Sequence, residues 1–167
     1  MHRKVFFSFH YDRDIWRVSQ IRNSWVTQGN ANSYAGWLDH AEWESVKRNG
    51  DTAIKRWIDT NLEGSSITVV CIGRETALRP WVQYETQRSY AKGNGIIGIT
   101  VHNLADRYGK TGICGPNPFD KVTLPNLTLL SPLRKLSSIV PIYDWKLNNG
   151  FANLGRWVED AAKKVGR

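Results

Sequence analysis

Long apolar runs and cysteine are both scarce in this chain of 167 residues. The longest apolar stretch, at 67–73, has about seven residues, whereas a membrane-spanning helix needs roughly 20. The cysteines are Cys71 and Cys114, too few for the disulfide framework of a small secreted protein. The first residues lead into a short apolar run without the architecture of a signal peptide. We therefore expect a protein of the reducing cytoplasm that has no membrane partner.

Acidic residues are also outnumbered. The chain has 15 Asp and Glu against 23 Lys and Arg, which gives a formal net charge of +8. A charge of this sign can serve nucleic-acid binding, but the basic residues are scattered and their longest runs are pairs. A solvated basic surface explains them, and we expect no nucleic-acid partner. With 41% apolar residues and eight Trp, the composition is that of a globular protein.

Apolar periodicity predicts strands that alternate with helices. The expected strands are 5–9, 34–38, 67–72, 96–101 and 140–143. Helices are expected after the first, second, third and fifth strands. A polar loop after 34–38 precedes a helix with Asp51 as N-cap, and the helix after 67–72 runs from Pro80 to about Ala91. Such alternation indicates an α/β fold, a three-layer sandwich in which helices cover both faces of a five-stranded parallel sheet.

The periodicity is lost between residues 102 and 138. This segment contains three Gly and four Pro and is too long for an ordinary connection, which is typical of a functional or covering insertion. We expect a single domain over 1–167 with a loop-rich insertion at about 102–138. The pattern does not choose between an interface, a lid and a cover for it.

Parallel sheets bind ligands beyond the carboxyl ends of their strands, where the strand order reverses. Glu85 stands out there, because a carboxylate in a pocket walled by indole can have a raised pKa or can stabilise a developing positive charge. The alternative is an exposed helix glutamate near Arg88. The whole set suits an aromatic, hydroxyl-bearing ligand such as a nucleotide. The polar and aromatic candidates near the strand ends are Ser8, Phe9, His10, Tyr11, Asp39, Trp43, Trp81 and Glu85.

Most known chemistries of this architecture are excluded. A phosphoacceptor receiver needs Asp at the end of the third strand, where this chain has 71–73, Cys-Ile-Gly. No glycine-rich phosphate loop follows the first strand, and 109–111, Gly-Lys-Thr, lacks the first glycine of a P-loop. None of the four His pairs with another at metal-ligand spacing, so we predict no metal site. The composition leaves a Ser-His-Asp triad open, although no G-x-S-x-G elbow is present.

Several segments resemble a known family. The first strand, VFFSFH at 5–10, resembles that of TIR domains, and RPWVQYE at 79–85 resembles their W-C-x-x-E motif, with Val82 in place of the usual Cys. The chain is further similar to the ThsB family, the TIR-like proteins of the bacterial Thoeris anti-phage system. This resemblance covers almost the whole chain and implies a flavodoxin-like sheet. The additional similar segments are RNSWVT at 22–27, KGNGIIGI at 92–99, GPNPFD at 115–120 and IYDW at 142–145.

The resemblance also implies an activity. Members of this family respond to phage infection by cleaving the nicotinamide–ribose bond of NAD+ and forming a cyclic ADP-ribose isomer, which activates the effector ThsA. NAD+ would be the substrate, and no cofactor is implied. The catalytic glutamate of the family corresponds to Glu85. The partners implied are NAD+, a ThsA-type effector reached through the nucleotide signal, an unidentified phage trigger and, as an open option, further copies of the chain.

The residue chemistry agrees with this role. Loss of nicotinamide leaves an oxocarbenium-like ribose, which the carboxylate of Glu85 can stabilise. Two other functions stay open, namely a non-catalytic TIR-like module that binds or senses by assembly, and a nucleoside transferase that uses Glu85 on another substrate. As pocket walls we predict Phe9, Tyr11, Trp43 and Trp81, and as polar contacts Ser8, His10 and Asp39.

Overall fold

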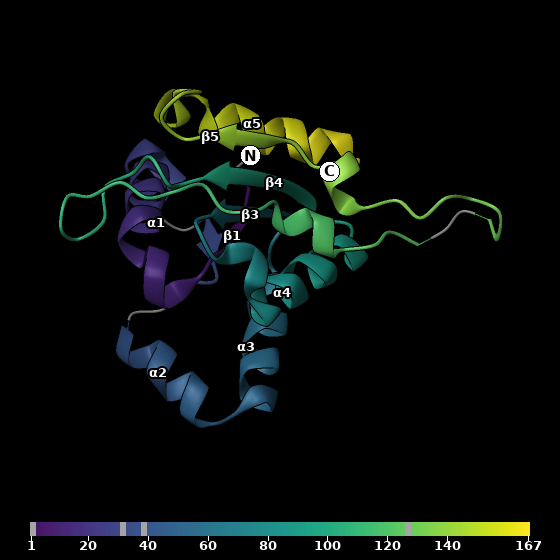
Figure 1. Cartoon of the computed structure of the whole chain (residues 1–167), viewed down its shortest axis with the longest axis horizontal. Coiled ribbons are helices and arrows are strands. Elements are labelled where there is room, and N and C mark those ends of the chain that lie inside the picture. Colours follow the sequence, from purple (N-terminus) through teal and green to yellow (C-terminus); the bar gives the residue numbers. More distant parts are fainter. Residues whose placement is uncertain (1–2, 31–32, 38–39, 126–127) are drawn as a thin grey trace.

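The computed structural model describes residues 3–30, 33–37, 40–125 and 128–167 (Figure 1). No helix in these parts of the chain combines the length and the apolar character that crossing a membrane requires. In chain order the helices and strands are β1 (Val5–Ser8), α1 (Tyr11–Trp25), β2 (Tyr34–Ala35), α2 (His40–Arg48), α3 (Asp51–Glu63), β3 (Ile67–Ile72), α4 (Pro80–Ala91), β4 (Gly95–Thr100), β5 (Ile142–Asp144) and α5 (Gly150–Lys164). They alternate along the chain except at α2 and α3, which follow one another, and at β4 and β5, between which no α-helix lies in the described residues.

The five strands form one parallel sheet in the order β2-β1-β3-β4-β5. In the register, Val5 of β1 lies opposite Tyr34 of β2 and Ile67 of β3. This strand order is that of flavodoxin-like folds, and it reverses between β1 and β3. The predicted α/β fold class is therefore confirmed, and the reversal marks the sheet edge at which a ligand is expected.

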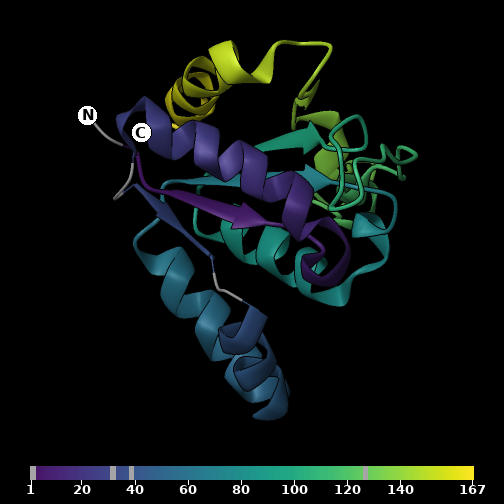
Figure 2. The ribbon, with the colours of Figure 1, turned by 90° about the vertical axis from the view of Figure 1, so that its left-hand side faces the viewer.

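Successive side chains of each strand point to opposite faces of the sheet, and both faces are apolar. Val5 and Phe7 of β1 pack in one cluster with apolar residues of α1 and α5, whereas Phe6 between them packs with α3. On that second face, Val82 of α4 packs with Val70 of β3. Figure 2 shows the resulting layers, with α1 and α5 on one side of the sheet and α3 and α4 on the other.

The structure corrects the prediction for residues 34–51. The second strand is only Tyr34–Ala35, and residues 40–48 form helix α2 instead of a polar loop. Asp51 is the first residue of α3 and not its N-cap, which is Gly50. Trp43 and Val46, one turn apart on α2, pack against the apolar cluster of α3. This narrow apolar face stabilises a helix whose polar composition predicted a loop, and Figure 1 shows α2 and α3 projecting together from the sheet.

Residues 102–138, predicted as an insertion, have a buried base and an exposed arm. Phe119 and Leu136 are fully buried in the cluster that also contains Val70 and Val82, so the base covers one face of the sheet. Thr123 and Lys135 then form an isolated antiparallel bridge. Beyond this bridge the chain extends far from the body (Figure 1), and the side chains of Leu129 and Leu130 are almost fully exposed.

Replacing Phe119 with Ala is expected to lower the free energy of unfolding by about 3–5 kcal/mol, because a buried aromatic side chain leaves a cavity when it is removed. Leu129→Ala is the matched control, since its side chain is exposed and fills no space in the core. Equilibrium unfolding in urea measures both. An unfolding free energy that Phe119→Ala leaves unchanged would show that the covering base is separable from the core.

Candidate active site

A cavity of about 220 Å³ opens at the carboxyl end of β1. It lies next to the reversal in strand order, the expected ligand position in this architecture. The loop after β1 supplies one wall, and α2, α3 and the start of α4 supply the others. The lining residues are Phe7, Phe9, His10, Tyr11, Asp12, Gly36, Trp43, Lys47, Trp57, Arg79, Trp81, Val82 and Glu85.

Glu85 reaches this cavity from the second turn of α4. The helix begins at Pro80, whose fixed φ and missing N–H suit the first helical position. The Glu85 side chain is only 7% exposed, and its Oε2 accepts a hydrogen bond from the hydroxyl of the fully buried Ser8 at the end of β1. Arg88, the surface neighbour considered above, pairs with Asp59 at 2.9 Å. A solvated surface glutamate is therefore excluded.

Burial also changes the acidity of this carboxyl. It raises the pKa of Glu85 to about 8, and the hydrogen bond from Ser8 opposes the shift only in part. At neutral pH the protonated form of Glu85 consequently predominates. A positive charge placed beside the carboxyl would favour ionisation, so a cationic ligand converts this group into a carboxylate where it is needed.

Aromatic rings from three elements line the cavity in a continuous series. The centroids of Phe9 and Tyr11 are 5.7 Å apart, and those of Tyr11 and Trp43 are 5.5 Å apart. The ring centroids of Trp43 on α2 and Trp57 on α3 are 6.1 Å apart, in an edge-to-face arrangement. Trp81 of α4 also lines the cavity. Planar apolar surfaces of this kind bind flat rings and exclude water.

Three buried polar atoms at the cavity have no hydrogen-bond partner in the part of the chain that the structure describes. They are His10 Nδ1, Trp43 Nε1 and Arg79 Nε. Burial, together with the positive charge of Arg79, lowers the pKa of His10, which favours its neutral form. Because buried polar atoms are normally paired, their clustering at one cavity indicates a ligand with hydrogen-bonding groups of its own.

The structure thus gathers Phe9, His10, Tyr11, Trp43, Trp81 and Glu85 around one space, with Ser8 behind the carboxyl. Asp39 lies outside the described residues. Among 3–30, 33–37, 40–125 and 128–167, no cluster of His, Cys, Asp or Glu side chains could hold a metal ion. The functional roles of the gathered residues stay predictions.

Among the lining residues that sequence reasoning missed, three have large or charged side chains from α2, α3 and the residue before α4, namely Lys47, Trp57 and Arg79. Trp57 packs on Phe6 and also lines the cavity. Lys47 lies on the helix that was predicted as a loop. Arg79 directly precedes Pro80, and its place at the start of the Trp-Glu helix was a signal that could have identified it.

Comparison with known proteins places this chain in a family. Residues 6–106 match the family described as "Thoeris protein ThsB, TIR-like domain", a range that includes all of β1 except its first residue and the whole of α2 and α4. A protein of Bacillus cereus (strain MSX-D12) named "Putative cyclic ADP-D-ribose synthase ThsB1" is 38% identical over 192 residues, which cover 95% of this chain and 100% of that protein. The chain belongs to the ThsB family of Thoeris TIR-like proteins.

Membership of the ThsB family confirms the resemblance drawn from the sequence. The one departure from the TIR motif W-C-x-x-E is Val82. This side chain is 2% exposed and packs with Val70 and Ile72 of β3, while it also lines the cavity beside Glu85. Valine is apolar and close in size to cysteine, so it suits this buried position.

The stability of Glu85→Gln is expected to differ from that of the parent in a pH-dependent way. The pKa of Glu85 is about 8 in the fold against an ordinary 4.5. The folded state therefore holds the extra proton, and the free energy of unfolding falls as the pH rises from 4.5 to 8. Glutamine is neutral throughout, so the variant becomes more stable than the parent by up to about 1.4 kcal/mol per pH unit in this window.

Urea denaturation at pH 5, 6.5 and 8 measures this difference. Glu63→Gln is the control, because Glu63 is an exposed residue at the end of α3. A stability difference for Glu85→Gln that is the same at all three pH values would contradict the raised pKa.

Proposed function

We propose that this ThsB-family protein cleaves the nicotinamide–ribose bond of NAD+ and closes the product into a cyclic ADP-ribose isomer. The observation that carries the proposal is the buried carboxyl of Glu85, facing an aromatic cavity at the switch point of the sheet. A 38% identical relative whose name is that of a cyclic ADP-D-ribose synthase supports it. The Trp-Glu motif of TIR domains, here Trp81 and Glu85, supports the assignment of the carboxylate.

The first chemical step is the loss of nicotinamide. The bond between ribose C1′ and the ring nitrogen breaks, and both electrons pass to the ring, which leaves as neutral nicotinamide and needs no acid. Before this bond breaks, the positive charge of the bound pyridinium lowers the pKa of Glu85, and the carboxyl proton of Glu85 passes to solvent. The resulting carboxylate then stabilises the oxocarbenium-like ribose.

The second step joins C1′ to a nucleophile from the adenosine half of the same molecule. Any proton that this nucleophile carries passes to solvent. Rings of Phe9, Tyr11, Trp43 and Trp81 exclude water from the cavity, which favours closure over hydrolysis. The unpaired N–H groups of Trp43 and Arg79 are positioned to donate hydrogen bonds to oxygens of the nicotinamide riboside half.

The proposed product is a signal. In a Thoeris context it would activate a ThsA-type effector after a phage trigger reaches the protein, and it would do so in the bacterial cytoplasm, where NAD+ is available. The trigger requirement shapes the test, because a resting enzyme need not turn over. The competing function is a non-catalytic sensing or assembly module.

Glu85→Gln is expected to lower the rate of nicotinamide release by about 10³-fold, because it removes the charge that stabilises the transition state. Purified protein is incubated with NAD+, with and without lysate from phage-infected cells, and the products are identified by chromatography and mass spectrometry. Glu63→Gln is the control for a surface charge. Equal rates for Glu85→Gln and the parent would overturn the mechanism, and no NAD+ product even with infected lysate would favour the assembly module.

The pH dependence of the triggered enzyme is expected to follow Glu85. The value of kcat/KM should rise tenfold per pH unit up to about pH 8, because the free enzyme must lose the Glu85 proton. Ser8→Ala removes the hydrogen bond that favours the carboxylate, so the profile should move to higher pH and the rate at pH 7 should fall several-fold. A profile that Ser8→Ala leaves in place would show that Ser8 does not tune this carboxyl.

A further inference from the structure

The cavity beside Glu85 is too small for the whole of the proposed substrate. Its volume is about 220 Å³, whereas pockets that enclose a drug-sized ligand measure roughly 300–1,000 Å³. A dinucleotide consists of two nucleosides and two phosphates. The nicotinamide riboside half must lie next to Glu85, because its C1′–N bond breaks there. The adenosine half therefore needs a site outside the cavity.

A second hollow continues from the mouth of the cavity. This groove has a volume of about 920 Å³, and the two spaces share Tyr11 and Asp12 as lining residues. It runs along α1 to residues 106–108 of the loop that follows β4. Figure 1 shows that this loop reaches past α1 at the side of the molecule. A ligand that extends from the cavity past Tyr11 and Asp12 would reach this groove.

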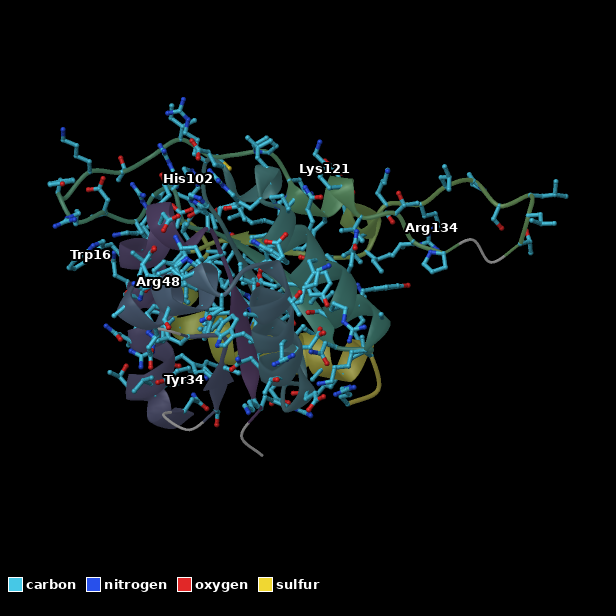
Figure 3. The ribbon with its side chains drawn as sticks, turned by 90° about the horizontal axis from the view of Figure 1, so that it is seen from below. Trp16, Tyr34, Arg48, His102, Lys121 and Arg134 are labelled. Carbon is cyan, nitrogen blue, oxygen red and sulfur yellow. The ribbon has the colours of Figure 1, made fainter. Side chains whose placement is uncertain are left out.

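Exposed aromatic side chains from two elements line the groove. Trp16 of α1 is 54% exposed and Tyr108 of the loop is 74% exposed, and Figure 3 shows Trp16 pointing outward at the edge of the molecule. One exposed aromatic residue needs no explanation. Trp16 and Tyr108, however, both line a groove beside the candidate active site, and their ring faces can stack on a nucleobase.

The charges along the groove suit a phosphate-bearing ligand. The guanidinium of Arg107 lies 5.3 Å from the ring centroid of Tyr108. Arg13, which also pairs with Glu75 at 3.2 Å, lines the same groove. The acidic groups already have partners. Asp106 Oδ1 accepts hydrogen bonds from the N–H groups of Tyr108 and Lys110 at 2.8 and 2.9 Å, and Asp12 lies 3.6 Å from the ammonium of Lys47.

Arg17 fixes the position of the loop that forms one side of the groove. This residue is 7% exposed; its Nε donates to the carbonyl of Leu104 at 2.9 Å and its Nη2 to that of Lys110 at 3.1 Å. Arg17 follows Trp16 directly on α1. The helix that carries one aromatic wall thus also fixes the loop that carries the other, so the groove exists before any ligand binds.

We propose that the groove between α1 and residues 106–108 binds the adenosine half of NAD+, with adenine against Trp16 and Tyr108 and the phosphates near Arg13 and Arg107. The proposal rests on the proposed function and adds a place for the second half of the substrate. It also gives a route to the cyclic product. After nicotinamide leaves, the adenosine half remains bound on the far side of Tyr11, from where it can turn into the emptied cavity and meet C1′.

Isothermal titration calorimetry on the purified chain tests the groove without turnover. The probes are ADP-ribose and AMP, which contain adenosine, and nicotinamide mononucleotide, which does not. Trp16→Ala is expected to weaken the binding of ADP-ribose and AMP about tenfold, and Trp16→Phe to retain most of the affinity. Phe151→Ala is the matched control, since Phe151 is an exposed aromatic residue on α5.

The variants also separate the groove from the catalytic proposal. Unchanged affinity of Trp16→Ala for ADP-ribose would overturn the groove, and so would an equal loss of affinity for nicotinamide mononucleotide, because that ligand does not reach Trp16. Tenfold weaker ADP-ribose binding by Trp16→Ala, combined with full NAD+ cleavage by Glu85→Gln, would uphold the groove and overturn the proposed mechanism. Circular dichroism checks that each variant is folded.

Discussion

The contact between Ser8 and Glu85 is the constraint on which the site depends. It joins the last residue of β1 to the second turn of α4, and both side chains are buried. Burying a carboxyl disfavours its charged form and raises the pKa of Glu85, and a cation beside the carboxyl would favour its ionisation. The parallel order β1–β3–β4 makes the contact possible, because it brings the carboxyl end of β1 and the start of α4 to the same edge of the sheet.

Two of the aromatic side chains around that carboxyl come from a part of the fold that lies off the sheet. Helices α2 and α3 project together (Figures 1 and 2) and bring Trp43 and Trp57 towards Tyr11. Trp57 at the same time packs on Phe6 of β1. The packing that anchors α3 to the sheet and the wall that closes the cavity are therefore one set of contacts, which couples the stability of this helix pair to the shape of the site.

Much of this could be predicted from the sequence, and the reasons are local. Ile67 to Ile72 is apolar on both alternations and becomes the central strand β3, as buried parallel strands require. The TIR resemblance rests on residues 5–10 and 79–85. From it we predicted Glu85 as the catalytic residue, and most of its neighbours were predicted from their places at the strand ends. The polar sequence of α2 led to the wrong prediction of a loop. Trp43 and Val46 become an apolar face only by packing against α3, a contact that the local sequence does not show.

The sequence by itself determined the fold class, the family and the identity of the candidate carboxyl, because strand–helix alternation and short motifs are written in neighbouring residues. Only the tertiary structure decided that Glu85 is buried against Ser8, that Trp57, Lys47 and Arg79 line the same cavity, and that a groove with Trp16 continues from it. These properties depend on distances between residues that are far apart in the chain. Burial, pKa and cavity shape exist only after the sheet has brought those residues together.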